Sequence, residues 1–321
     1  MSTLNAAMVY DDILLQTTAL QIVFIILYII VFLVGISGNL LVVFVVLRKK
    51  AMHSITNIYI ANLATSDIMM GLFAIPVTSL HFFVKSWIFG EFLCTLFPMT
   101  MSILVYVSTL SCTVIAVLRY FAIVYPLKPK IGRCTCFVIV VFIWFLFMAI
   151  SWPLGYFSKT IIVNDTVLCV EKWPKWQARQ FFTLTNIILQ YLIPCSIIIY
   201  CYVKISLALD RRSKSHVVRN STDSEREQRE IQRKRRTNKM MIYVVTIFVV
   251  CWMPLNLFHI ISDFHQTFAY SPYYSLIFFI THLVAMSSTM YNPFIYAFMS
   301  EKFKTEFKDL LRCHLFCKNP M

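Results

Sequence analysis

The sequence predicts an all-α membrane protein, in which seven transmembrane helices form a bundle and a short amphipathic eighth helix lies on the inner leaflet. Of the 321 residues, 59% are hydrophobic and 14% are charged, and the mean hydropathy is +0.72. A water-soluble surface does not have this composition, so the lipid bilayer is the expected solvent. Seven apolar runs are each at least 23 residues long, and as helices they can cross a hydrocarbon core of about 30 Å.

These runs define the elements in order along the chain. They lack the roughly ten-residue alternating segments of barrel strands, and a helix satisfies its own backbone hydrogen bonds in lipid, so we expect a helical bundle. The runs are Leu20–Leu47, Asn57–His81, Phe92–Val124, Thr135–Phe157, Gln180–Ala208, Asn238–Ser262 and Tyr273–Met299.

The runs divide the chain into three parts. Residues 1–19 form an outer N-terminal segment, residues 20–299 form the seven-helix domain with a polar loop at 209–237, and residues 300–321 form the amphipathic helix and a tail. Asp11 and Asp12 precede the first run, where a cleaved signal peptide would carry basic residues. We therefore expect this run to be the first helix of the mature protein.

Lysine and arginine are distributed unevenly between the loops on the two sides. With the N-terminus outside, 24 of the 29 lie in the inner segments and the tail. Because inner loops of membrane proteins are enriched in these residues, we expect the N-terminus outside and the C-terminus in the cytoplasm. The net charge of +14 then reflects topology and an anionic inner leaflet, and nucleic acid is not an expected partner.

Motifs for common enzyme chemistry are missing from the sequence. Only 6 glycines are present, and none begins a GxGxxG, GxxxxGKS or GxxxxGKT nucleotide-binding pattern. Neither HExxH nor GxSxG occurs, which removes the commonest metalloprotease and serine-hydrolase signals. We therefore expect a protein that is not an enzyme.

Three residues at the outer face are candidates for covalent modification. Of 10 cysteines, only Cys94 and Cys169 lie on the oxidising side, so we expect them to pair; the alternative is two free thiols. Asn164 begins an N-glycosylation triplet in an outer loop. Asn220 begins a second triplet on the cytoplasmic side, where it should stay unmodified.

Asp67 is a charged residue in the middle of the second run. Inserting such a residue costs about 2.5–3.5 kcal/mol, which makes it a candidate functional residue. No lysine or arginine lies deep in another run, so its partner is either polar side chains or a small cation. The structural alternative is a protonated Asp67 that only bonds its neighbours. Residues that can share its cavity are Asn39, Ser108, Ser288 and Asn292.

An amphipathic stretch, Glu301–Arg312, follows the seventh run, with phenylalanine and leucine on one face and lysine among the others. We expect it to lie on the inner leaflet, with membrane lipid as a partner. Cys313 and Cys317 follow as palmitoylation sites. With His314 they would supply three zinc ligands and no fourth nearby, so a metal cluster is the weaker alternative.

The polar loop Asp210–Thr237 changes composition sharply to Arg, Lys, Ser, Glu and Gln. Glu225 with Arg229, and Glu230 with Lys234, have the i,i+4 order that supports a helix, so the sixth helix can extend into the cytoplasm. A disordered linker is the alternative, whereas a position between two membrane spans argues against a nuclear-localisation signal.

Prolines inside the runs remove helical hydrogen bonds and predict kinks. Kinks beside Trp252 and Tyr296 mark places where a helix can pivot. The prolines are Pro76, Pro153, Pro194, Pro254 and Pro293.

With these residues in place, the chain resembles the class A, rhodopsin-like G-protein-coupled receptors over nearly its whole length. The resemblance implies a plasma-membrane receptor that activates a heterotrimeric G protein of the inhibitory type, and it allows arrestin as a further partner. Cys94 and Cys169 match the outer disulfide of the family. The helix motifs are Gly38-Asn39, Asn62-Leu63-Ala64 with Asp67, Trp144, Pro194 and Tyr202, Cys251-Trp252-Met253-Pro254, and Asn292-Pro293-Phe294-Ile295-Tyr296.

The resemblance also implies roles for single residues. Asp67 with Ser108 would form an inhibitory sodium site, and no other cofactor is expected. Trp252 would be the switch below the ligand. The residues implied in activation and G-protein coupling are Arg119, Tyr120, Trp252, Pro254, Tyr202, Asn292, Pro293 and Tyr296, with Tyr202 and Tyr296 as a water-linked pair.

The chain departs from this family at Leu118, where an acid usually precedes the Arg-Tyr pair. Arg119 therefore lacks the adjacent carboxylate that holds it in the resting state. The inner end of the sixth helix carries Arg233–Arg236, which we expect to repel Arg119. Glu230 is the nearest acid that could replace the missing one.

Within the class, loop phrases resemble the neuropeptide Y, neuropeptide F and RYamide group of peptide receptors. They are Trp87-Ile88-Phe89-Gly90, Val124-Tyr125-Pro126-Leu127-Lys128-Pro129 and Trp252-Met253-Pro254-Leu255-Asn256-Leu257-Phe258. In that group an acid at the position of Asp263 receives the arginine of an amidated Arg-Tyr or Arg-Phe terminus. Asp263 is expected to face an outer loop without lysine or arginine.

Thr78, Gln190 and His282 match other pocket positions of that group. Met101 and His259 depart from the Gln and Asn common there, which leaves a receptor for an unrelated peptide as an alternative. Asp263 as a solvated loop carboxylate and His282 as a packed helix residue are the structural alternatives.

Two other classes of membrane protein are disfavoured. An amine receptor needs an acid in the outer half of the third helix, and Phe97–Tyr106 contains none. Transporters often carry internal repeats, and no repeat relates residues 20–160 to 180–300.

Overall fold

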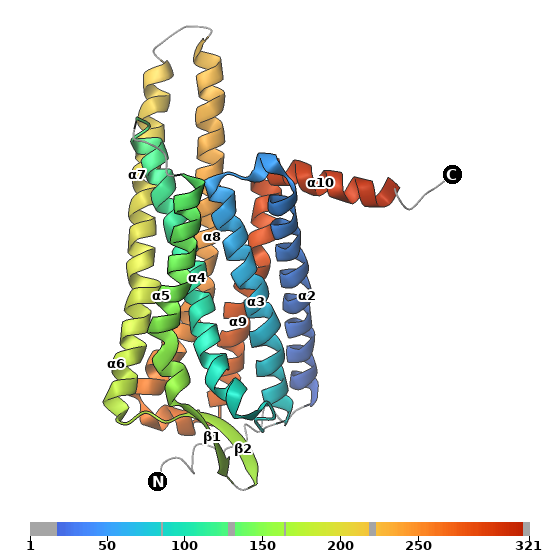
Figure 1. Cartoon of the computed structure of the whole chain (residues 1–321), viewed down its shortest axis with the longest axis vertical. Helices are drawn as coiled ribbons and strands as arrows, with labels where there is room; N and C mark the ends of the chain where they lie inside the picture. Colours follow the sequence, from blue (N-terminus) through green and yellow to red (C-terminus); the bar gives the residue numbers. More distant parts are fainter. Residues whose placement is uncertain (1–17, 85, 128–131, 164, 218–222, 317–321) are drawn as a thin grey trace.

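The seven apolar runs form seven long helical segments packed side by side (Figure 1). The computed structural model describes residues 18–84, 86–127, 132–163, 165–217 and 223–316, and in this part of the chain seven segments are long and apolar enough to cross a membrane. The predicted fold class is confirmed. The segments are α2 (Thr18–Arg48), α3 (Ile55–Val84), α4 (Gly90–Val124), α5 (Arg133–Phe157), α6 with α7 (Trp176–Ile187 and Ile193–Val217), α8 (Asp223–Phe264) and α9 (Tyr274–Met299).

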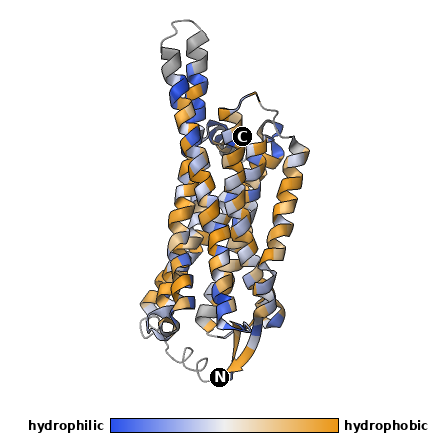
Figure 2. Cartoon of the chain, turned by 90° about the vertical axis from the view of Figure 1, so that its left-hand side faces the viewer, coloured by the Kyte–Doolittle hydropathy of each residue, from blue (hydrophilic) through white to orange (hydrophobic). Residues whose placement is uncertain are grey.

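Hydrophobic residues extend along most of the length of the helices (Figure 2), and many of them are exposed on the outside of the bundle. Leu33 in α2 is 58% exposed, and Phe142 and Phe145 in α5 are 62% and 66% exposed. In water, such a continuous apolar surface would drive association, whereas hydrocarbon chains solvate it. The outward faces of these helices are therefore the surfaces that contact lipid.

The fifth span is interrupted by a π-helical turn. Residues Ile188–Leu192 form this turn (η2) between α6 and α7, and Pro194 follows as the second residue of α7. Because proline has no backbone N–H, the carbonyl four residues earlier, that of Gln190, loses its helical partner. A wider turn at this point is the usual local adjustment, and such turns occur often at functional sites.

A β-hairpin lies at one end of the bundle, which we call the hairpin end. Strand β1 (Ser158–Val163) pairs antiparallel with β2 (Thr166–Glu171), and Asp165 in the turn has a φ of 59°. Cys169 in β2 forms a disulfide with Cys94 in α4. The predicted pairing is confirmed, and it attaches the hairpin to the bundle beside the entrance between the helices.

The opposite end of the bundle, the α10 end, carries an additional helix. Helix α10 (Glu301–Phe316) follows α9 and runs sideways from the bundle (Figure 1). Phe303 and Phe307 are buried beneath it, and the Phe303 ring stacks on that of Tyr296 with centroids 5.5 Å apart. The expected eighth helix is confirmed. It is amphipathic, and its apolar face packs against the end of α9.

Much of the polar segment 209–237 is helical. Helix α7 continues to Val217 and α8 begins at Asp223, so both extend beyond the bundle at the α10 end (Figure 1). This agrees with the i,i+4 pairing expected along the segment, and Lys234 indeed lies 3.5 Å from Glu230. A polar helix pair of this kind is stable where water replaces lipid.

Helices α2 and α9 approach closely at Gly38. A Cβ atom on Gly38 would lie 2.8 Å from Cγ of Pro293, so any other residue would push the kink of α9 outward. Gly38 therefore positions the segment of α9 that contains Asn292 against the interior of the bundle.

Candidate functional site

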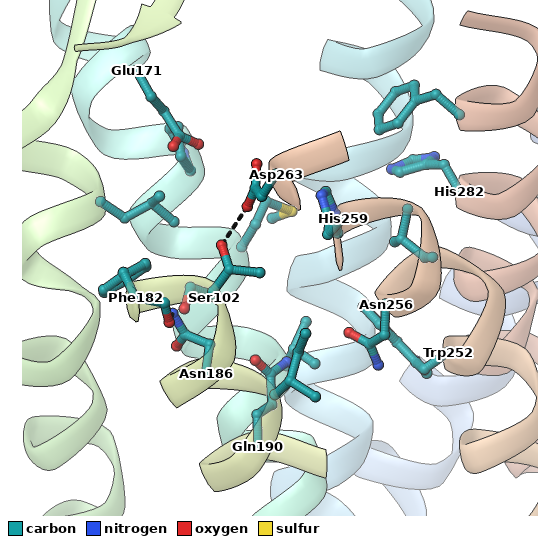
Figure 3. A pocket seen from close by; sticks show the side chains of 18 of the residues that line it. Ser102, Glu171, Phe182, Asn186, Gln190, Trp252, Asn256, His259, Asp263 and His282 are labelled. Carbon is teal, nitrogen blue, oxygen red and sulfur yellow. Dashed lines mark hydrogen bonds between the residues drawn. The ribbon is translucent and has the colours of Figure 1, made fainter. Parts of the chain in front are cut away.

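A cavity of about 310 Å³ lies among the helices toward the hairpin end. Apolar side chains form most of its wall, and a few polar groups converge on it, as is typical of ligand pockets (Figure 3). Trp252 and Gln190 lie on its deep side, away from the hairpin residue Glu171 (Figure 3). The four ligand-binding residues predicted from the sequence all line it: Thr78, Gln190, Asp263 and His282. Met101 and His259, the two positions that differ from the neuropeptide Y, neuropeptide F and RYamide group, line it as well.

Asp263 is buried on the side of this pocket near the hairpin. It lies near the end of α8 and is 3% exposed. Its Oδ1 lies 2.8 Å from Nε of Arg179 in α6, and its Oδ2 accepts a hydrogen bond of 2.5 Å from Oγ1 of Thr183 (dashed in Figure 3). Gln180 donates to its main-chain carbonyl at 3.0 Å. Asp263 is thus neither a solvated loop residue nor free of cations.

The outer loop that follows Asp263 contains no lysine or arginine, as expected, but α6 supplies Arg179 as a cationic neighbour that was not foreseen. Arg179 was assigned to the loop before the fifth span, because the apolar run begins only at Gln180. The helix begins at Trp176, and this extra turn carries the Arg179 guanidinium over the pocket. Amphipathic spacing within Trp176–Thr183 is the signal that could have revealed it.

Glu171 is a second carboxylate at the same rim. It ends β2, and its Oε2 lies 3.8 Å from Nε of Arg179 and accepts a hydrogen bond of 2.7 Å from Trp173. The Arg179 guanidinium also lies over the ring of Trp176, at 5.5 Å from its centroid. Two carboxylates thus share one guanidinium, which leaves these three side chains with a net charge of −1. The hairpin that brings Glu171 here had not been predicted from the sequence.

His282 lies on the opposite wall of the pocket in α9. It forms a 2.8 Å hydrogen bond through Nδ1 with the hydroxyl of Tyr28 in α2, and its ring lies 5.5 Å from that of Phe278. His282 is therefore both a packed helix residue and part of the pocket wall. Tyr28, which fixes its ring, had no distinguishing motif in the sequence.

Below the pocket, polar side chains continue toward the centre of the bundle. Trp252 donates through Nε1 to the hydroxyl of Ser288 at 3.1 Å. Further along, Oδ2 of Asp67 accepts a hydrogen bond of 2.8 Å from Asn292, and the hydroxyls of Ser66 and Ser108 lie 2.8 Å apart. Polar contacts therefore occur both at the deep side of the pocket and around the buried acid.

The surroundings of Asp67 fit a small cation. Asp67 is 5% exposed, and no ion pair of the described residues neutralises it. Hydroxyl and carboxylate oxygens are the ligands that hard cations prefer. Asn39 is oriented differently, because its amide donates at 2.8 Å to the carbonyls of Gly35 and Thr289. Asp67 and Ser108 therefore remain the candidate ligands.

Comparison with known proteins places this arrangement in a family. The model of the family "7 transmembrane receptor (rhodopsin family)" matches residues 38–296. The chain is 33% identical to "Neuropeptide Y receptor type 2" of Cavia porcellus over 306 residues, which cover 93% of this chain and 78% of that protein. It is 33% identical to the type 2 receptor of Homo sapiens over 301 residues, covering 91% and 77%.

A further relative is "Neuropeptide Y receptor type 6" of Mus musculus, which is 33% identical over 308 residues, covering 91% of this chain and 81% of that protein. The chain belongs to the rhodopsin family of seven-transmembrane receptors. As a member with seven membrane-spanning helices, it is a multi-pass plasma-membrane receptor and not an enzyme.

The residues of this receptor expected to couple to a G protein gather at the α10 end. Tyr202 in α7 and Tyr296 in α9 are 5% and 1% exposed. The Tyr296 hydroxyl and Nε of Arg119 are both buried without a hydrogen-bond partner among the described residues. Tyr120 lies with its ring 6.0 Å from that of Tyr200. Among the described residues, Arg119 forms no ion pair with an acid, and Leu118 beside it supplies none.

The basic cluster Arg233–Arg236 is largely paired with acids. Arg235 donates to Asp210 in α7 at 2.6 Å, and Arg236 donates to Glu301 in α10 at 2.8 Å. Glu230 pairs with Lys234 instead of Arg119. The screened repulsion expected between this cluster and Arg119 stays a prediction, and neighbouring helices supply acids that lower the net charge of the cluster.

Three predicted modification sites lie at or beyond the limits of the described residues. Asn164 and Cys317 are outside them, and Cys313 falls within α10 although its side chain is not described. Their glycosylation and palmitoylation stay predictions.

Proposed function

We propose that this receptor binds a C-terminally amidated peptide ending in Arg-Tyr or Arg-Phe and activates a heterotrimeric G protein of inhibitory type. The carrying observation is the buried carboxylate of Asp263 in the pocket wall. It already contacts the guanidinium of Arg179 at 2.8 Å, so its geometry suits a guanidinium. The arginine of the peptide would pair with this carboxylate through charge-assisted hydrogen bonds.

Similarity to relatives supports the ligand class. The proteins matched over more than nine-tenths of this chain carry the name neuropeptide Y receptor. The amidated terminus would enter the deeper pocket, where Gln190, Thr78 and His282 supply polar groups and Trp252 lies next to the apolar wall. An aromatic final residue suits that apolar surface.

The hairpin end is proposed to face outward. A disulfide forms in an oxidising compartment, and Cys94–Cys169 lies at this end. The α10 end carries most of the lysines and arginines, which favours the cytoplasmic side. The G protein would then bind between the inner ends of α4, α7 and α8, where Arg119, Tyr120 and Tyr202 lie, and arrestin could use the same surface.

The test is a signalling assay on cells that express the full-length receptor. Amidated peptides ending in Arg-Tyr or Arg-Phe are compared with their free acids and with analogues in which citrulline, a neutral isostere, replaces the arginine. We expect G-protein activation by the amidated arginine peptides and a large loss with either change. A response that ignores the citrulline replacement would favour a receptor for an unrelated peptide, and peptide flux without G-protein activation would indicate a transporter.

A further inference from the structure

We propose that Arg179 is a built-in competitor for the ligand's arginine and that Glu171 is its alternative partner, so that peptide entry exchanges one guanidinium for another on Asp263. This inference rests on the proposed function, in which Asp263 receives the arginine of the peptide. It adds a residue from α6 and one from β2 to the determinants of ligand specificity.

Both carboxylate oxygens of Asp263 have a close neighbour in the present arrangement. Nε of Arg179 lies 2.8 Å from Oδ1 as an ion pair that lacks hydrogen-bond geometry, and Thr183 donates a hydrogen bond to Oδ2. The Asp263 side chain is 4% exposed, whereas that of Arg179 is 29% exposed. A guanidinium from a ligand binds a carboxylate best through two parallel hydrogen bonds. It can reach Asp263 in that way only after Arg179 has moved.

Glu171 gives Arg179 a place to move to. Nε of Arg179 already lies 3.8 Å from Oε2 of Glu171, and Trp173 holds that carboxylate in place through a 2.7 Å hydrogen bond. Figure 3 shows Glu171 and Asp263 at the same rim of the pocket. The ring of Trp176, 5.5 Å from the Arg179 guanidinium, can support the cation as it turns. The exchange therefore requires rotation of one side chain and no helix movement.

Charge balance favours this exchange only for a cationic ligand. Before binding, two carboxylates share one guanidinium. After an arginine enters, Asp263 pairs with the ligand and Glu171 pairs with Arg179, so each charge has a partner. A neutral ligand side chain would displace Arg179 without replacing its charge, leaving Asp263 buried and unpaired, which is strongly unfavourable. Arg179 thus rejects peptides that lack a cation at this position.

The first experiment measures binding of an amidated Arg-Tyr peptide to membranes that contain the full-length receptor. Arg179→Gln should increase the affinity by about tenfold, because the competitor is gone. Glu171→Gln should decrease the affinity, because Asp263 is then the only carboxylate with which Arg179 can pair at this rim. In Arg179→Gln/Glu171→Gln, the loss caused by Glu171→Gln should disappear, a clear departure from additivity. Lys175→Gln, which removes an exposed cation that does not line the pocket, is the matched control and should leave affinity unchanged.

A second experiment needs no peptide. It tests whether Arg179 competes with a free guanidinium for Asp263 even if no peptide of this class binds. Thermal unfolding of purified Arg179→Ala receptor is measured with Nα-acetyl-arginine amide or the matching citrulline amide. The arginine compound should raise the unfolding temperature of Arg179→Ala more than that of the parent, and the citrulline compound should not. The effect should vanish in Arg179→Ala/Asp263→Asn.

These measurements separate the two proposals. If the parent binds the peptide and loses affinity with the citrulline analogue, but Arg179→Gln leaves affinity unchanged or lower, the exchange is wrong and the proposed function stands. If the parent binds the peptide and its citrulline analogue equally well, the proposed function fails. If the arginine amide raises the unfolding temperature of the parent and of Arg179→Ala equally, the exchange of guanidinium groups is wrong.

Discussion

Arg236 in α8 donates from Nη1 to Oε1 of Glu301, the first residue of α10, at 2.8 Å, and from Nη2 to the carbonyl of Phe298 at 3.1 Å. This contact ties α8 to the end of α9 and the start of α10. Helix α8 contains Pro254. The part of α8 that lies between this proline and the α10 end of the bundle can pivot there. Any outward swing of that part must break the contact.

Glu301→Gln should therefore increase signalling without ligand. The two side chains are 41% and 62% exposed, and exposed ion pairs contribute only about 0.2–1 kcal/mol. The expected increase in the active fraction is up to about fivefold, measured as G-protein activation per surface receptor. Glu306→Gln is the matched control, because Glu306 pairs with Lys49 at 3.0 Å and does not contact α8 through that pair. Equal effects of both substitutions would contradict a role for the α8 contact.

Basal signalling should also depend on Leu118. Arg119 has no acid partner among the described ion pairs, and leucine cannot accept the bond that a neighbouring carboxylate would. If the missing bond shifts the equilibrium by about 1.4 kcal/mol, the active fraction rises about tenfold while it is small. Leu118→Asp should lower ligand-free signalling with peptide binding retained.

Leu118→Asn serves as the control for this substitution, because it is polar without a charge. If neither variant changes ligand-free signalling per surface receptor, packing around Arg119 alone holds the resting state.

Sodium should reduce agonist affinity through Asp67. A cation that binds only the resting conformation shifts the population away from the active one. Asp67→Asn removes the charge while Asn292, 2.8 Å away, keeps a hydrogen-bond partner. Agonist binding in the variant should lose its dependence on sodium, measured against choline at equal ionic strength, and antagonist binding should change little. Equal sodium sensitivity in parent and variant would rule out this site.

Asp263→Ala should weaken an amidated arginine peptide by well over tenfold, because losing one partner of a desolvated charge pair costs about 2–5 kcal/mol. Replacing the arginine of the peptide with citrulline should cause a similar loss in the parent. Combining both changes should add little. The four affinities form a double-mutant cycle, and full additivity would show that the two groups do not interact.

Much of the architecture follows from local sequence. Apolar runs such as Leu20–Leu47 and Thr135–Phe157 predicted α2 and α5 closely, because a span in lipid must satisfy its backbone hydrogen bonds within itself. Cys94 and Cys169 were paired from their side of the membrane alone. The four predicted ligand residues all line the pocket, although their roles in binding stay predictions.

The sequence by itself determined the spans, the disulfide and the amphipathic helix, since each depends on composition, periodicity or compartment. Only the tertiary structure decided what surrounds Asp263. The π-turn Ile188–Leu192 adds a residue to one turn of the fifth span, and one residue corresponds to about 100° of helix rotation. This rotation, together with the early start of α6, sets the direction in which Arg179 points. Its contact with Asp263 arises from packing between distant segments, which no local pattern encodes.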